Sequence, residues 1–231
     1  MKKISIILPT LNEAETIEKV IDSIPKEILY KLGYDIEVLV VDGGSTDGTQ
    51  WKALKKGARV LIVRKRGYGL AYLIGFKYAR GEYIVTLDAD MTYPPRCIPL
   101  LLLALERYGL DFISTNRFKF YEAGAFNKPR LIGNKIINVL TFILFGVRIK
   151  DTQSGMWCFR KDILNRLKLK CWGMDFSTEI KLEAFKKAKA GEISIYYLKR
   201  RKGSSKIKLL KDGLRIVLFL IKKRILTLVG L

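Results

Sequence analysis

The chain has 231 residues, of which 49% are hydrophobic, so it can form one globular domain with a substantial core. Its 43 Lys and Arg residues outnumber 22 Asp and Glu, and the net charge of +21 points to an anionic partner such as nucleic acid, an acidic membrane surface or a phosphorylated substrate. It contains no histidine, which excludes Ser-His-Asp and Cys-His catalysis and every histidine metal site. Its three cysteines lack metal-ligand spacing and indicate reduced thiols in a cytosolic setting.

Strand and helix signals alternate from the N-terminus. Buried-type apolar runs predict strands at 4–8, 36–41, 59–63 and 83–87. Helical patterns follow them at about 17–24, 51–54, 67–79 and 97–108. This alternation favours an α/β fold with a mostly parallel central sheet and helices on both faces. Ligands of such sheets bind outside the carboxyl ends of the strands.

After a further predicted strand at 112–115 the alternation breaks. The polar, basic and aromatic segment 116–130 predicts a mobile loop. An apolar stretch at 136–147, a helix near 177–188 and a strand around 193–198 follow. We expect a catalytic domain over residues 1–206 and an amphipathic helix over 207–231.

The stretch "VTLDADMTYPP" (85–95) ends a buried strand in two carboxylates, Asp88 and Asp90, one residue apart. A solvated turn is one explanation, because Asp is common in turns. The other is a divalent cation that holds a diphosphate, since Mg²⁺ takes one or two carboxylates together with phosphate oxygens. Asp42 and the cluster 9–13 end neighbouring strands at the same sheet edge, which favours the metal site.

Several motifs occur together and in order: "ILPTLNEAE", "VVDGGSTDGT", "GYGLAYLIG", "TLDAD", "DTQSG" and "RKGSSK". As a set, over residues 4–206, they resemble the family 2 glycosyltransferases, with the dolichol-phosphate mannose synthases and their glucose counterparts as the nearest branch. The resemblance implies a nucleotide-sugar glycosyltransferase A-type fold, a nucleotide-sugar donor, Mg²⁺ or Mn²⁺, and inversion at the sugar carbon.

The resemblance also implies roles for individual residues of the site. Those expected around the base and ribose of the donor are Pro9, Leu11, Glu13, Val40 and Asp42. Those expected at the metal and diphosphate are Asp88, Ala89 and Asp90, with Asp88 and Asp90 as the metal ligands. The matching basic positions near the phosphates are Arg117 and Arg130, and the basic motif after the last strand is matched by Arg201, Ser205 and Lys206. The expected catalytic residues are Asp88, Asp90, Arg117 and Arg201.

Three positions depart from the family pattern. Gly43 stands where a second carboxylate is usual, Thr92 where mannose synthases often have a glutamine metal ligand, and Trp157 where an arginine is expected. The motif "DTQSG" is also familiar from the glucosyl branch. We expect mannose from GDP-mannose, with glucosyl or N-acetylglucosaminyl transfer from a UDP-sugar as the alternative.

The missing histidine is consistent with a lipid phosphate acceptor. A hydroxyl acceptor needs a general base, whereas a polyprenyl or dolichyl phosphate is already ionised near neutral pH. The enzyme then has to align and neutralise phosphates, which suits a metal and Arg or Lys side chains.

The C-terminal stretch supports a lipid acceptor. At about 100° per residue its charged residues share one face, namely Lys208, Lys211, Asp212, Arg215, Lys222 and Lys223. Such a helix can lie in an anionic membrane interface, its five basic residues attracting acidic lipid; a helix packed on the core is the alternative. The apolar runs are too short to span a bilayer. We expect a peripheral protein on the cytoplasmic face of a membrane, and recruitment by a membrane protein stays open.

Two rival classes fit less well. A sugar nucleotidyltransferase should carry a glycine-rich, basic loop after its first strand, and "PTLNEAE" has neither glycine nor a basic residue. A nucleic-acid-binding module explains the charge but not carboxylates at strand ends, so we expect no nucleic acid partner.

Overall fold

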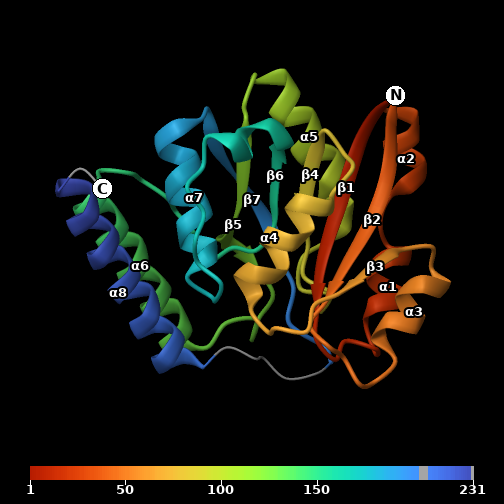
Figure 1. The fold of residues 1–231 in the computed structure, drawn as a ribbon, viewed down its shortest axis with the longest axis horizontal. Helices are drawn as coiled ribbons and strands as arrows, with labels where there is room; N and C mark the ends of the chain where they lie inside the picture. The colour runs from red at the N-terminus through yellow and green to blue at the C-terminus, as the bar shows by residue number, and fades with distance from the viewer. Residues whose placement is uncertain (203–207, 230–231) are drawn as a thin grey trace.

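The computed structural model describes residues 1–202 and 208–229 (Figure 1). Its centre is a seven-stranded sheet in the order β3-β2-β1-β4-β6-β5-β7. The strands are β1 (Lys2–Thr10), β2 (Tyr34–Asp42), β3 (Arg59–Ile62), β4 (Tyr83–Thr86), β5 (Phe112–Tyr121), β6 (Trp157–Arg160) and β7 (Ala190–Tyr197). Strands β1 to β4 run parallel to one another, as the alternating sequence pattern predicts.

Helices cover both faces of the sheet, which confirms the predicted α/β architecture. One face packs against α1 (Ile17–Asp22), α2 (Lys26–Lys31), α3 (Thr49–Lys55) and α5 (Ile98–Arg107). The other face packs against α4 (Tyr68–Tyr78) and α7 (Phe176–Lys187). Neighbouring residues of β1 point to opposite sides, so that Ile6 belongs to one apolar core and Ile7 to the other.

Strand β6 is antiparallel to both of its neighbours, β4 and β5, whereas β5 and β7 are parallel. The sheet is therefore mixed. Strand β6 was not predicted, because this four-residue run stands one residue after the turn-rich motif "DTQSG".

The prediction of a mobile loop over 116–130 is wrong. Strand β5 continues to Tyr121, and its end pairs with β7 through Phe120 opposite Tyr196. Aromatic residues favour an extended, half-buried chain, and Phe118 packs on the core. Helix α6 (Lys128–Phe145) begins soon afterwards, where the side chain of Asn127 accepts a hydrogen bond from the Arg130 N–H.

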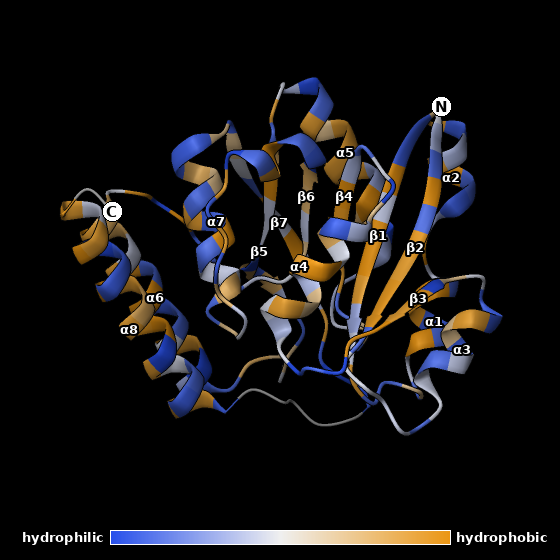
Figure 2. Ribbon diagram, in the orientation of Figure 1, coloured by the Kyte–Doolittle hydropathy of each residue, from blue (hydrophilic) through white to orange (hydrophobic). Residues whose placement is uncertain are grey.

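Helices α6 and α8 (Leu209–Leu228) lie side by side at one edge of the molecule (Figure 1). Ile216 and Leu220 of α8 are buried against α6 and α7. Figure 2 shows apolar residues along both helices. Many of their side chains are exposed, including Val139, Phe142 and Ile143 of α6 and Leu218, Ile221 and Ile225 of α8. Within 1–202 and 208–229 no helix is long and apolar enough to cross a membrane.

Two of the five basic residues that we expected to attract acidic lipid are engaged within the protein. Arg215 Nε lies 3.0 Å from Asp175 Oδ2, and Lys223 Nζ lies 2.7 Å from Glu183 Oε1. The carboxylates of the α7 region, remote in sequence, therefore offset part of the charge that Arg215 and Lys223 could present to lipid. Lys208, Lys211 and Lys222 are exposed.

The loop before β4 packs closely against the backbone of β1 at Gly81, and a substitution there tests this packing. A Cβ atom at Gly81 would lie 2.4 Å from the Ser5 nitrogen and 2.7 Å from the Ile4 carbonyl carbon, both backbone atoms. We expect Gly81→Ala to lower the free energy of unfolding by about 1–3 kcal/mol, because the backbone of β1 must shift. Denaturant unfolding measures this. Gly213→Ala in α8 is the matched control, with no atom within 4 Å of the new Cβ, and should not destabilise the protein. Equal unfolding midpoints for Gly81→Ala and the wild type would contradict the packing described.

Candidate active site

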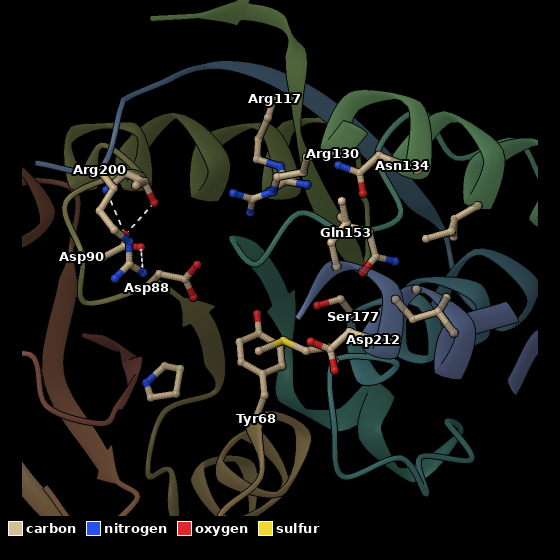
Figure 3. A pocket seen from close by; sticks show the side chains of 18 of the residues that line it. Tyr68, Asp88, Asp90, Arg117, Arg130, Asn134, Gln153, Ser177, Arg200 and Asp212 are labelled. Atoms are coloured by element: carbon tan, nitrogen blue, oxygen red, sulfur yellow. Dashed lines mark hydrogen bonds and ion pairs between the residues drawn. The ribbon is translucent and has the colours of Figure 1, made fainter. Parts of the chain in front are cut away.

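A cavity of about 930 Å³ opens beyond the carboxyl ends of β1 and β4 and continues between α6 and α8. Its polar end is lined by Asp88, Asp90, Arg117, Arg130 and Arg200 (Figure 3). Its apolar end is lined by residues of α6 and α8, among them Ile132, Ile136, Ile137, Leu214, Ile216 and Val217. A single cavity therefore joins a charged region to an apolar region.

The acidic pair lies where the sequence predicts, directly after β4. Asp90 is buried and accepts hydrogen bonds from the Thr92 N–H at 3.0 Å and from the Thr92 hydroxyl at 2.6 Å. Met91, between them, has a φ of +65°, which lets the chain turn back so that Thr92 reaches Asp90. Thr92 thus orients one carboxylate of the pair.

Asp88 is half-buried and shares its surroundings with Asp90. Burial, and after it the charge of Asp90, raise the pKa of Asp88 to about 7 against the opposing effect of Arg117, Arg200 and Arg130. A cation binding here would displace a proton below neutral pH and stabilise both carboxylates.

The donor set of this region fits a divalent cation. The guanidinium of Arg200 forms an ion pair with Asp90 and lies 3.7 Å from Glu13 Oε1, so a positive group already stands beside the carboxylate. Two carboxylates are too few to enclose an ion, and Mg²⁺ or Mn²⁺ bound to them would complete its shell with water and phosphate oxygens. In the described parts of the chain no group of three or more acidic, Cys or His residues that could hold a metal ion is found.

Most of the expected donor-binding residues line this cavity. They are Pro9, Leu11, Glu13, Asp88, Ala89, Asp90, Arg117 and Arg130. Val40 and Asp42 are fully buried in β2 and are not among the residues that line it. Ser205 and Lys206 lie outside the described residues.

The carboxylate of Asp42 is engaged within the protein. It accepts hydrogen bonds from the Thr10 hydroxyl at 2.8 Å, the Ser45 N–H at 2.8 Å and the Gln50 amide at 2.7 Å. Burial by itself would raise the pKa of Asp42, but these hydrogen bonds outweigh that effect and hold the pKa below its ordinary value. Asp42 therefore anchors the loop after β2, whose Gly43 lines the cavity.

Arg200 lies in the cavity, where the resemblance led us to expect Arg201. The side chain of Arg201 is 66% exposed and lies 2.6 Å from Glu122, away from the cavity. Its neighbour Arg200 lines the cavity and reaches Asp90. The basic run "KRRK" holds no signal that separates the two, because the strand alternation ends at Tyr197.

A buried charge network holds Arg117. Its Nε and Nη2 donate to the two carboxylate oxygens of Asp151 at 2.7 and 2.8 Å. Lys181 is fully buried and donates to the Asp151 carbonyl at 2.7 Å, and Glu192 accepts the Asp151 N–H at 3.1 Å. Side chain and backbone of Asp151 are thus both fixed, and with them the "DTQSG" loop.

Other residues of the cavity carried no functional expectation. They are Tyr68 from α4, Asn134 from α6, Gln153 from the "DTQSG" loop, Ser177 from α7 and Asp212 from α8 (Figure 3). Asn134 is 7% exposed, and its Nδ2 has no hydrogen-bond partner among the described residues. Tyr68 and Gln153 belong to "GYGLAYLIG" and "DTQSG", two motifs used for the resemblance. Asn134, Ser177 and Asp212 belong to none of these motifs and are brought to the cavity by the folding of distant helices.

Residues 5–168 match the model of the family described as "Glycosyl transferase family 2". The chain belongs to this family. The motifs at 7–15, 40–49 and 86–90 that carry the resemblance all lie within the matched residues, and each contributes residues that line the cavity.

Curated relatives agree with this membership. The low-salt glycan biosynthesis hexosyltransferase Agl6 of Haloferax volcanii is 32% identical over 94% of this chain and 53% of its own length. A dolichol-phosphate mannosyltransferase of Pyrococcus furiosus is 32% identical over 89% of this chain and 59% of its own length. The glycosyltransferase AglJ of Haloferax volcanii is 32% identical over 91% of this chain and 68% of its own length. The chain spans between about half and two thirds of these relatives.

Solved structures confirm the nucleotide-sugar glycosyltransferase A-type fold. Glucosyl-3-phosphoglycerate synthase from Mycobacterium tuberculosis, in complex with Mn²⁺, UDP and glucosyl-3-phosphoglycerate, is similar with a TM-score of 0.75 and 25% identity. The similarity covers 96% of this chain and 80% of that one. The same enzyme has been solved with Mn²⁺, UDP-glucose and phosphoglyceric acid.

The buried lysine of the network allows a test by pH. Burial lowers the pKa of Lys181 from 10.5 to about 7. Between these values the unfolded chain holds a proton that the folded chain has released, so this group makes the free energy of unfolding rise with pH. In Lys181→Met that contribution is absent.

Denaturant unfolding from pH 7 to 10 should therefore show the wild type gaining stability relative to Lys181→Met as the pH rises. The exposed Lys186 of the same helix supplies the control Lys186→Met, which should keep the wild-type pH dependence. Parallel curves for the wild type and Lys181→Met would contradict a neutral, buried Lys181.

Proposed function

We propose that this protein transfers a hexose, with inversion, from a nucleotide sugar to a polyprenyl or dolichyl phosphate at a membrane surface. The observation that carries the proposal is the continuity of the cavity: carboxylates and arginines at one end, apolar side chains of α6 and α8 at the other. A phosphate attached to a long hydrocarbon chain matches both ends at once.

The donor we propose first is GDP-mannose. The similarity to a dolichol-phosphate mannosyltransferase over 89% of the chain supports it. The alternative is a UDP-sugar, supported by the similar structure that contains UDP-glucose. Pro9, Leu11 and Glu13 would lie against the base and ribose, where they line the cavity beside Gly43.

The acceptor phosphate would bind near Arg117 and Arg130. Both arginines line the cavity, and the unpartnered Nδ2 of Asn134 offers a further donor to a phosphate oxygen. Asp151 accepts two hydrogen bonds along one edge of the Arg117 guanidinium, so that group is already oriented before substrate binds. Positioning of the ionised phosphate against the sugar carbon replaces a general base, which accords with the absence of histidine.

Asp88 and Asp90 would hold Mg²⁺ or Mn²⁺, with Arg200 nearby. The cation, when bound, supplies positive charge to the departing diphosphate. The residues themselves position the donor: Asp90 is fixed by Thr92, and Arg200 can pass from the carboxylate to a phosphate oxygen once the cation has neutralised the pair.

We propose that α6 and α8 rest on the membrane from the cytoplasmic side. Their exposed Val139, Phe142, Ile143, Leu218 and Ile225 supply apolar area, and Lys208, Lys211 and Lys222 supply attraction to acidic lipid. Recruitment by a membrane protein would use the same surface.

The function is tested by incubating the protein with Mn²⁺, a polyprenyl phosphate and radiolabelled GDP-mannose, UDP-glucose or UDP-N-acetylglucosamine. We expect labelled lipid from GDP-mannose, and its loss with a chelator. Asp90→Asn should abolish transfer, because it removes a charge needed to hold the cation while keeping the shape of the side chain. Failure of all three donors, or normal turnover by Asp90→Asn, would overturn the proposal.

Membrane association is tested by flotation with vesicles of neutral and anionic lipid. Replacing Ile143 and Leu218 by glutamine should reduce the floated fraction several-fold, because burying each apolar side chain contributes about 1.5–3 kcal/mol. Leu100→Gln on α5 is the control: Leu100 is 53% exposed and lies outside α6 and α8. High salt should release part of the wild type from anionic vesicles. Equal flotation of the double variant and the control would refute this surface.

A further inference from the structure

Three polar side chains that carry no positive charge line one side of the cavity. They are Tyr68, Ser177 and Asp212, which come from α4, α7 and α8 respectively. In Figure 3 they lie across the cavity from Arg117 and Arg130. Lys65 and Arg66, which precede Tyr68 in the chain, also line the cavity.

Tyr68 lies close to the acidic pair. A Cβ placed on Gly155 would be 2.7 Å from the Tyr68 hydroxyl and 3.2 and 3.3 Å from the carboxylate oxygens of Asp88. The absence of a side chain at Gly155 is therefore what lets this hydroxyl and this carboxylate approach one point. Ser177 lines the same cavity and lies on the same side of it as Tyr68 (Figure 3). The Tyr68 hydroxyl consequently stands beside the region proposed for the metal and diphosphate.

Asp212 is placed by the first turn of α8. Its Oδ2 accepts a hydrogen bond from the Lys208 N–H at 2.8 Å. Its Oδ1 accepts none of the hydrogen bonds found among the described residues, and Asp212 takes part in no ion pair of that part of the chain, although 43 residues are basic. Leu209, Gly213 and Leu214 of the same helix line the cavity beside it.

A carboxylate repels phosphate, so the Asp212 wall does not suit the diphosphate or the acceptor phosphate. It suits neutral hydroxyl groups, which donate charge-assisted hydrogen bonds to a carboxylate and exchange hydrogen bonds with Tyr and Ser hydroxyls. In a nucleotide sugar the group that follows the diphosphate is the hexose, which carries several such hydroxyls.

We propose that Tyr68, Ser177 and Asp212 form the subsite that binds the hydroxyls of the transferred hexose and selects among hexoses. This inference rests on the proposed function and adds the residues that select which sugar is transferred. It makes α8 part of the active site as well as part of the proposed membrane surface. A site that hydrogen-bonds particular hydroxyls discriminates against sugars that lack them or point them elsewhere.

The test distinguishes contacts to the hexose from contacts to the nucleotide. Calorimetry with Mn²⁺ measures the Kd of GDP-mannose and of GDP, and of UDP-glucose and of UDP, for the full chain. The variants are Asp212→Asn, whose Oδ1 can still accept from the Lys208 N–H, and Tyr68→Phe, which removes only the hydroxyl. Lys211→Ala is the matched control, since Lys211 is an exposed neighbour of Asp212 on the same helix.

We expect each variant to raise the Kd of the preferred nucleotide sugar about tenfold, as for loss of a hydrogen bond to a charged or buried group. The Kd of the matching nucleoside diphosphate should stay within about twofold, and the preference between the two sugars should shrink. Lys211→Ala should resemble the wild type.

Equal effects on nucleotide sugar and nucleoside diphosphate, or no effect on either, would overturn the hexose subsite. If the wild type binds neither nucleotide sugar, the proposed function itself fails, an outcome that the wild-type measurements alone reveal. Melting temperatures of the variants distinguish lost contacts from lost folding. Asp212→Ala provides a second replacement if the asparagine variant is poorly folded.

Discussion

The buried pair of Arg117 and Asp151 is the interaction on which the arrangement of the cavity depends. A guanidinium in the core is stable only where its hydrogen bonds are met, and Asp151 meets two of them from the next segment of chain. Lys181 and Glu192 then fix the backbone of Asp151 from α7 and β7. Removing one member would leave a charge uncompensated, at a cost of about 3–5 kcal/mol. The pair thereby joins β5, the "DTQSG" loop and α7 into one frame.

That frame explains why charges of opposite sign can lie in one cavity without all of them forming ion pairs with one another. Arg117 is held by Asp151. Among the residues that the structure describes, Arg200 is the basic side chain that forms an ion pair with Asp90. Asp90 is held in turn by Thr92. Each charge is oriented by a neighbour before any substrate arrives, so little reorganisation remains for binding. Preorganisation of this kind suits an enzyme whose main task is to align phosphate groups.

Helix α8 connects this charged region to the outer surface. Its ion pairs to Asp175 and Glu183, together with buried Ile216 and Leu220, hold it on the α/β body. The opposite side of the helix exposes leucine and isoleucine. The same helix therefore presents cavity-lining residues inward and apolar residues outward, so that a lipid acceptor could pass from one to the other without crossing water.

The sequence by itself determined the alternating strands β1 to β4, the sheet edge at which polar residues gather, the acidic pair at the end of β4 and the family. These features are local: a run of apolar residues and the charge that ends it can be recognised without knowing the neighbours. Only the tertiary structure decided the extension of β5 to Tyr121, the antiparallel β6, the choice of Arg200 over Arg201 and the internal pairing of Arg215 and Lys223. It also brought Asp212 into the cavity. Each of these depends on which distant segment packs alongside, and the energy of a strand pair or an ion pair exists only once both partners have been brought together.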